Sequence, residues 1–234
     1  MISVIIFLCY FFCMNNMIKI IAFGLVFLGM IGLGIWGLSK LKVDDFHKAA
    51  VIFVVDSSAS NLANLPKEKM MIRQLCSMLD PEDQIKILRV SEDSYLIYEG
   101  SPQSSSDIRK SMEKFTQYDA KEYGTAYGLA LEKAFNHAMN MNKEGYIPAV
   151  VVIGDLENEG DVNKQINWDE FPKNVMNVKN QSEDFAMMFM FAAPEKLDMV
   201  KEKLGPVLGE NKLIIGNEIT TNKSLRRFLN AIGR

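Results

Sequence analysis

Five oxygen-bearing side chains stand where the chain could assemble a metal site. Asp56-x-Ser58-x-Ser60 places one carboxylate and two hydroxyls at alternate positions, and Thr125 and Asp155 add a third hydroxyl and a second carboxylate. Carboxylate, hydroxyl and water oxygens are the ligands that Mg²⁺, Ca²⁺ and Mn²⁺ prefer. Two carboxylates and three hydroxyls leave such an ion incompletely coordinated, so waters or an oxygen atom from another molecule must complete its shell.

Nucleophilic catalysis fits these residues less well. Asp56 as a phosphatase-type nucleophile would need a second acid at position 58, where the chain has serine. A serine hydrolase would need a G-x-S-x-G turn, and the sequence contains none. His47 and His137 are the only histidines, which leaves few groups for acid–base catalysis. We therefore expect a binding protein and not an enzyme.

Each of these residues also has a purely structural explanation. An aspartate at the end of a strand can cap the next helix, serines are common in turns, and Thr125 could be a helix N-cap. Glu157, Glu159 and Asp161 can be a solvated loop, or they can tune selectivity at the rim of a site. The structural explanation must account for all five oxygen-bearing residues at once.

Unbroken apolar runs position the two aspartates. Residues 49–55 end at Asp56, and residues 149–153 are followed by Gly154 and Asp155. Runs of this length, rich in β-branched residues, are typical of strands buried on both faces of a parallel sheet. The carboxyl ends of parallel strands lie at one edge, where open α/β sheets bind ligands. We therefore expect Asp56 and Asp155 to converge there, joined by a helix that starts at Gly124-Thr125.

Strand and helix patterns alternate along the rest of the chain. This alternation predicts an α/β fold: a doubly wound, mostly parallel central sheet with helices on both faces and one antiparallel edge strand. Ser104-x-x-Asp107 resembles a helix capping box, and residues 156–184 carry no readable pattern. The remaining predicted strands are 84–90, 95–98, 185–192 and 212–215, and the predicted helices are 62–79, 108–115, 124–138, 194–204 and 224–232.

The motif resembles that of von Willebrand factor A-type (vWA) domains with a metal-ion-dependent adhesion site (MIDAS). That family carries D-x-S-x-S after its first strand, a threonine that opens a middle helix, and an aspartate that ends its fourth strand. The resemblance implies that the Ser58, Ser60 and Thr125 hydroxyls contact a divalent cation, and that Asp56 and Asp155 hold its coordinating waters. It also implies Mg²⁺ as the ion, with Mn²⁺ and Ca²⁺ as alternatives.

This sequence departs from the family pattern at three positions around the site. Ala59 stands where glycine is common, Gly154 stands where threonine is common, and Leu156 follows Asp155 in place of glycine. These departures concern the shape of the rim more than the five candidate residues themselves.

The N-terminal part predicts a membrane anchor. Residues 20–38 carry no charge and would form a helix of roughly 28 Å, close to the thickness of a bilayer core. No A-x-A-like cleavage site follows, which favours an anchor over a removed signal peptide. Residues 1–19 are then an apolar extension, 39–47 a linker and 48–234 the folded domain. We expect a single-pass protein with an extracytoplasmic domain, although Lys40 and Lys42 favour the opposite orientation.

Composition narrows the choice of partner. The net charge is −3 and no basic face stands out, which disfavours nucleic acid. We expect a protein partner that offers an Asp or Glu carboxylate to the cation. The alternatives are a metal-free scaffold or assembly component of a membrane complex, and, least favoured, a metal-assisted hydrolase.

Overall fold

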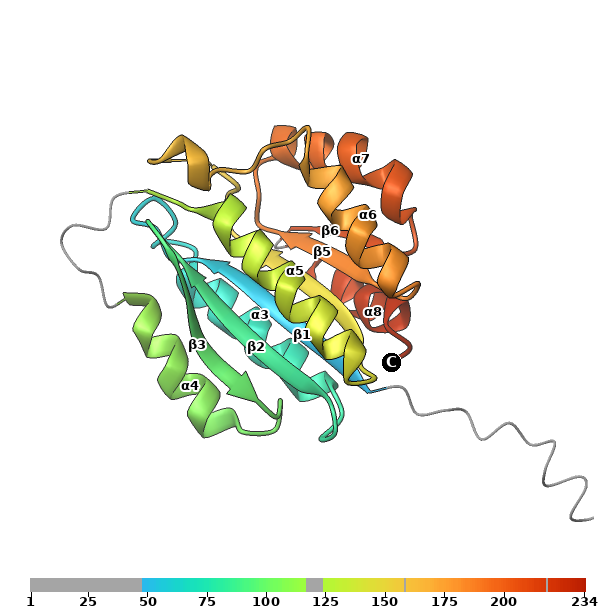
Figure 1. Ribbon diagram of the computed structural model, residues 1–234. Helices are drawn as coiled ribbons and strands as arrows, with labels where there is room; N and C mark the ends of the chain where they lie inside the picture. Colours follow the sequence, from blue (N-terminus) through green and yellow to red (C-terminus); the bar gives the residue numbers. More distant parts are fainter. Residues whose placement is uncertain (1–47, 117–123, 158, 218) are drawn as a thin grey trace, which may run out of the picture. The chain divides into compact units, whose positions relative to one another are not determined.

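A single six-stranded sheet organises the domain (Figure 1). The computed structural model describes residues 48–116, 124–157, 159–217 and 219–234. The strands lie in the order β3-β2-β1-β4-β5-β6. Their bounds are β1 Ala49–Asp56, β2 Gln84–Val90, β3 Ser94–Gly100, β4 Ile147–Ile153, β5 Ala186–Met190 and β6 Leu213–Gly216.

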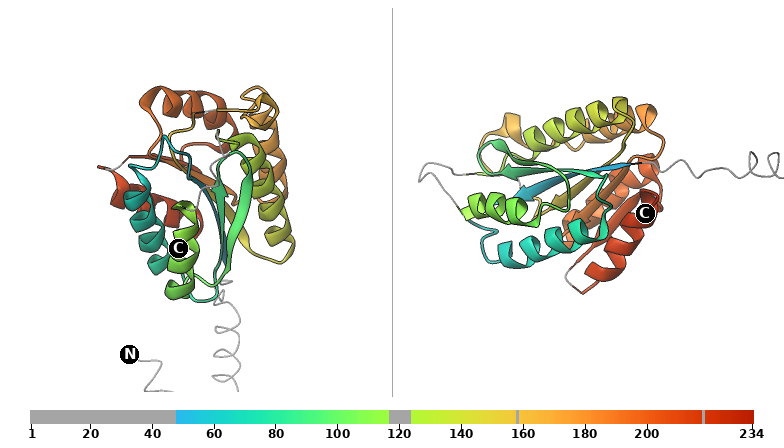
Figure 2. Two further views of the ribbon diagram at one scale, coloured as in Figure 1. Left: turned by 90° about the vertical axis from the view of Figure 1, so that its left-hand side faces the viewer. Right: turned by 90° about the horizontal axis from the view of Figure 1, so that it is seen from below.

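Helices connect the strands and cover the sheet on two sides (Figure 2). Helices α3, α4 and α8 pack on one face, and α5, α6 and α7 pack on the other. The helices are α3 Leu65–Met78, α4 Ser105–Glu113, α5 Tyr127–Lys143, α6 Phe171–Gln181, α7 Pro194–Leu208 and α8 Thr221–Ala231, with short 3₁₀ turns η1 Lys114–Thr116 and η2 Val162–Lys164.

Strand pairing confirms the predicted sheet. β1 pairs in parallel with β2 and β4, β4 pairs in parallel with β5, and β5 with β6. Only β3 runs antiparallel, as the edge partner of β2. The predicted α/β architecture, with one antiparallel edge strand and helices on both faces, is therefore confirmed for the described residues.

Alternation along β1 shows why its apolar run is continuous. Val51, Phe53 and Val55 pack into the core under α3, α4 and α8. Ile52 and Val54 pack into the core under α5, α6 and α7. Both faces of the strand are buried, so neither set of alternate positions can be polar. The strand can end in charged and hydroxyl groups only where it leaves the two cores, at Asp56.

Three local predictions need correction. Helix α6 lies in the segment without a readable pattern, where Phe171, Val175 and Val178 supply a buried stripe. Helix α5 begins at Tyr127 and not at Gly124-Thr125. The Ser104 side chain makes no capping hydrogen bond to α4.

The predicted membrane location is also corrected. The predicted span, residues 20–38, and its neighbours 1–19 and 39–47 lie outside the described residues. Within the part of the chain that the structure describes, no helix has both the length and the apolar composition that a bilayer crossing requires. The longest of these helices, α5, has 17 residues and carries Glu132, Lys133 and Lys143. The structure therefore gives no basis for assigning the protein to a membrane.

A buried carboxylate joins the amino-terminal ends of β1 and β2. Asp83 is fully buried and accepts hydrogen bonds from the backbone N–H groups of Ala49 (2.7 Å) and Asp80 (2.9 Å). Its Oδ2 lies 3.0 Å from Nε of Arg234, which brings the segment that follows α8 to the same place. One carboxylate therefore organises three segments of the chain.

Replacing Asp83 by asparagine is expected to lower the free energy of unfolding by about 2 kcal/mol. The amide keeps one acceptor oxygen but loses the charge that faces Arg234, and its NH₂ group turns a donor toward another donor. Urea unfolding of the 234-residue chain measures the change. The control is Asp198→Asn, an exposed partner of Lys201 on α7, which should change stability by less than about 0.5 kcal/mol. Equal effects of the two substitutions would contradict the role assigned to Asp83.

Candidate metal centre at the carboxyl edge of the sheet

Asp56 is held rigidly at the end of β1. Its side chain is fully buried, with Oδ1 accepting a hydrogen bond from the Ser58 N–H (2.7 Å) and Oδ2 accepting one from the Tyr127 hydroxyl (3.0 Å). Burial raises the pKa of Asp56 to about 7, although the hydrogen bonds from Ser58 partly oppose that increase; the nearby Asp155 carboxylate adds to it. The environment thus places a carboxylate where its negative charge is poorly solvated.

Two serine hydroxyls connect the β1 loop to Asp155. The Ser58 and Ser60 oxygens lie 3.0 Å apart, and Ser60 Oγ donates to Asp155 Oδ2 at 3.4 Å. Ser58 is buried, whereas Ser60 is exposed. Four of the five predicted residues therefore form one continuous polar chain from Asp56 to Asp155, open to solvent at Ser60.

Thr125 precedes α5 and does not cap it. Its backbone N–H donates to the Glu159 carbonyl (3.0 Å) as part of an isolated antiparallel bridge. Two residues later, Tyr127 hydrogen bonds to Asp56, so the start of α5 lies against the end of β1. The Thr125 hydroxyl is buried, and no hydrogen-bond partner for it occurs among the described residues. A buried hydroxyl without a partner is energetically unfavourable unless another ligand satisfies it.

Tyr127 is a central residue that the sequence reasoning missed. Its hydroxyl donates to Asp56 and accepts a hydrogen bond from the Leu156 N–H at 3.3 Å. The side chain is fully buried, and burial raises its pKa well above the usual value, so the phenol remains a donor. Tyr127 therefore connects the β1 loop, the start of α5 and the β4 loop. Its place on the buried face of a predicted helix gave no signal of this role.

The structure explains one departure from the family pattern, at Gly154, and shows the backbone conformation at another, Leu156. Gly154 has φ +141°, and a Cβ atom there would lie 2.2 Å from the Tyr127 hydroxyl and 2.4 Å from Asp56 Cβ. Position 154 therefore cannot carry a side chain in this arrangement. Leu156, where the family often has glycine, has φ +61° and is buried. Its backbone adopts the left-handed conformation that glycine adopts without strain.

A buried pair beneath the β1 loop was also missed. Asn61 donates from Nδ2 to the Asp56 carbonyl (2.9 Å) and to Glu68 Oε1 (2.8 Å). Glu68, on α3, is fully buried, and burial raises its pKa to about 8. A glutamate on a helix is usually exposed, so sequence periodicity gave no indication that Glu68 points inward.

The donor set is unusual for a protein metal site. No group of three or more His, Cys, Asp or Glu side chains within the described ranges could hold a metal ion by itself. At this edge the two carboxylates are joined by serine hydroxyls. Exposed acidic residues follow Asp155 in the chain, and Oε2 of the first, Glu157, pairs with Nζ of Lys196 at 3.0 Å.

The chemistry of this edge fits a divalent cation. It combines a poorly solvated carboxylate at Asp56, a second carboxylate at Asp155 and a buried Thr125 hydroxyl that the described residues leave without a partner. All the donor atoms are hard oxygens, which suit Mg²⁺ and Mn²⁺. The role of the five residues as metal ligands stays a prediction.

Comparisons with known proteins support the fold. Residues 51–158 match the family model of the von Willebrand factor type A domain. A search of curated proteins found no match. Among solved structures, a von Willebrand factor type A protein from Catenulispora acidiphila superposes with a TM-score of 0.56 at 12% identity, over 80% of this chain and 43% of that one. The chain thus spans less than half of that relative.

Two further solved structures carry metal. Proximal thread matrix protein 1 from the mussel byssus, with a zinc-occupied MIDAS motif, has a TM-score of 0.54 and 11% identity, over 79% of this chain and 48% of that one. Manganese-loaded TRAP protein from Plasmodium vivax has a TM-score of 0.57 and 12% identity, over 80% and 74% of the two chains. Identities this low establish the fold alone. Together with the match over residues 51–158, they support a von Willebrand factor type A-like fold for the described domain.

Proposed function

We propose that this domain is a non-enzymatic binding module that docks a carboxylate of a partner protein through a divalent cation. The hydroxyls of Ser58, Ser60 and Thr125 would contact the cation, and Asp56 and Asp155 would hold its waters. A bound cation would supply an electrophilic docking point for the partner's carboxylate. Two observations carry this proposal: the polar chain from Asp56 to Asp155, and a buried Thr125 hydroxyl, two residues before Tyr127, that has no partner among the described residues.

Groups of the chain itself fix the orientation of the Asp56 carboxylate and leave the site accessible on the side of Ser60. Tyr127 and the Ser58 N–H each occupy one oxygen of Asp56, which fixes the plane of its carboxylate. Ser60 is the exposed member of the set, so an incoming carboxylate would approach from its side. Without a cation, the carboxylates of Asp56 and Asp155 would repel an acidic partner, which makes docking conditional on metal.

Catalysis is not expected from these residues. Asp56 has both carboxylate oxygens engaged by hydrogen-bond donors. His137 lies on α5, with Nδ1 3.4 Å from Nζ of Lys86 in the first half of β2, away from the carboxyl edge. The two metal-containing structures described above support cation use by this fold, and they carry no information on this chain's partner.

Metal binding is expected to depend on Ser60 and Thr125. Mn²⁺ titrated into the 234-residue chain should enhance water proton relaxation, because waters remain in an incomplete shell. Ser60→Ala and Thr125→Val should each weaken Mn²⁺ binding by at least about tenfold. Thr125→Val should not lower the melting temperature of the metal-free protein, because the hydroxyl that it removes has no partner. Ser106→Ala, at an exposed serine on α4, is the matched control.

A separate measurement tests whether the bound cation accepts a carboxylate from another molecule. A peptide with a single glutamate should reduce the relaxation enhancement of the Mn²⁺-loaded chain by displacing water, and the same peptide with glutamine should not. EDTA should abolish the effect. If Mg²⁺, Mn²⁺ and Ca²⁺ give neither binding nor a thermal shift, the proposal fails and a metal-free scaffold is the better description.

A further inference from the structure

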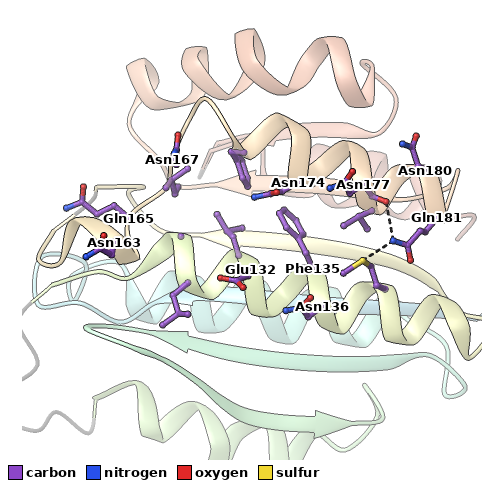
Figure 3. A pocket seen from close by; sticks show the side chains of 17 residues that line it. Glu132, Phe135, Asn136, Asn163, Gln165, Asn167, Asn174, Asn177, Asn180 and Gln181 are labelled. Carbon is purple, nitrogen blue, oxygen red and sulfur yellow. Dashed lines mark hydrogen bonds between the residues drawn. The ribbon is translucent and has the colours of Figure 1, made fainter.

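A groove lies between α5 and α6, on the face of the sheet that α5, α6 and α7 cover (Figure 3). Its volume is about 730 Å³, and 17 residues line it. They come from the two helices and from residues 163–167, which precede α6. The volume falls within the range of about 300–1,000 Å³ that is typical of pockets for small ligands. None of the five candidate metal ligands lines it.

Carboxamide side chains dominate the lining. Eight of the 17 residues are asparagine or glutamine, and they extend along the whole length of the groove (Figure 3). Asn174, Asn177 and Asn180 follow one another at intervals of three along α6, and Asn136 lies across from them on α5. These four are exposed, and their side chains make no hydrogen bond within the described part of the chain. Their donors and acceptors are therefore available to a ligand.

The lining disfavours charged and helical ligands. Glu132 is the one ionisable residue among the 17, and neither lysine nor arginine is present, so a phosphate or sulfate group would meet no cation. None of the exposed large hydrophobic residues of the described domain lines the groove. The apolar residues of the lining are buried or half-buried and form a floor beneath the carboxamides, so the large apolar side chains of an amphipathic helix would meet a mostly polar rim. An extended peptide pairs with the open edge of a sheet, and this groove lies between helices.

An apolar floor accompanies the carboxamides. Phe135 rises between the two helices (Figure 3) and stacks on Phe171, with ring centroids 5.8 Å apart. Leu129 and Met139, which also line the groove, are half-buried and extend this apolar surface toward solvent. A surface that joins an apolar floor to uncharged groups, each able to donate and to accept hydrogen bonds, complements a molecule with C–H faces and many hydroxyls.

We propose that the α5–α6 groove binds a neutral oligosaccharide. The sugar hydroxyls would hydrogen bond to Asn136, Asn174, Asn177 and Asn180, and the C–H faces of the rings would lie on the apolar floor. This site is separate from the candidate metal centre and does not depend on the proposed docking function. Binding of sugar therefore needs no divalent cation.

The test uses the 234-residue chain on an array of neutral oligosaccharides of glucose, galactose, mannose and N-acetylglucosamine, with sulfated and sialylated chains and uncharged peptides beside them. We expect retention on neutral saccharides, equally with and without EDTA. Calorimetric titration of the best-retained oligosaccharide then gives the affinity. Titrating the free chain and the same chain attached to a carrier protein distinguishes a soluble sugar from a glycoprotein as the source, and binding of either supports the site.

Asn174→Ala combined with Asn177→Ala should weaken that affinity by at least about tenfold, since each substitution removes hydrogen bonds to the ligand. Alanine favours the helix more than asparagine does, so the double variant should keep its melting temperature. The matched control is Asn140→Ala with Asn230→Ala, two exposed helical asparagines outside the groove. Retention only on charged chains or peptides, loss of binding in EDTA, or an equal loss in the control would overturn the proposal.

Discussion

Replacing Gly154 by alanine is expected to lower the free energy of unfolding by about 4 kcal/mol and to abolish metal binding. The added Cβ would lie 2.2 Å from the Tyr127 hydroxyl and 2.4 Å from Asp56 Cβ, and both of these side chains are fully buried. Overpacking of this kind costs about 1–3 kcal/mol, and a non-glycine residue in a rarely populated backbone conformation adds about 1–3 kcal/mol. Because Tyr127 hydrogen bonds to Asp56, any relaxation must move the carboxylate.

A second glycine separates the cost of overpacking from the cost of backbone strain. Gly145 also has a positive φ, +87°, but a Cβ there meets nothing within 4 Å. Gly145→Ala should therefore cost only the backbone strain, about 1–2 kcal/mol, and should leave Mn²⁺ binding unchanged. Urea unfolding and Mn²⁺ titration of both variants measure the difference. If the two alanines cost the same, the close contact at Gly154 does not constrain the site.

The free energy of unfolding of the metal-free chain is expected to fall by about 3 kcal/mol between pH 5 and pH 8 because of Glu68 alone. Burial raises the pKa of this carboxyl to about 8, and the charges of Asp56 and Asp155 add to the shift. Between the ordinary glutamate pKa and pH 8 the native state holds a proton that the unfolded chain has released. Stability therefore decreases as pH rises through this window, by at most about 1.4 kcal/mol for each pH unit.

Glu68→Gln isolates this contribution. The amide is uncharged at every pH and keeps the oxygen that accepts from Asn61. Urea unfolding in EDTA should show that the variant lacks about 3 kcal/mol of the decrease seen in the parent chain, and that it is the more stable of the two at pH 8. Glu202→Gln, at an exposed position on α7, is the control and should follow the parent. An unchanged pH profile for Glu68→Gln would mean that Glu68 is ionised in the native state.

Strand position and sheet type could be predicted from the sequence because burial on both faces leaves a direct signal. β1 and β4 are apolar at every position before their aspartates, and no helix or exposed strand needs that pattern. Parallel pairing then brings Asp56 and Asp155 to one edge, whatever the loops do. The motif therefore indicated both the fold and the location of the candidate site.

The sequence pattern did not predict where the helix after Thr125 begins, and it did not predict helix α6. Thr125 resembles a helix cap, but its backbone is taken up by a bridge to Glu159, 34 positions away in the chain. Helix α6 keeps only three buried residues among asparagines and lysines, a stripe too narrow to stand out. The apolar segment 20–38 predicted a membrane protein, and the described helices provide no membrane span.

The sequence by itself determined the sheet, its antiparallel edge strand, and the edge where Asp56 and Asp155 lie, because burial and strand direction leave local sequence patterns. Only the tertiary structure decided how those groups are held. Tyr127 bridges Asp56 and Leu156, Asn61 joins Asp56 to a buried Glu68, and Gly154 leaves room for the Tyr127 hydroxyl and the Asp56 side chain. These partners come from different elements, and no periodicity within one element predicts a contact between side chains that only folding brings together.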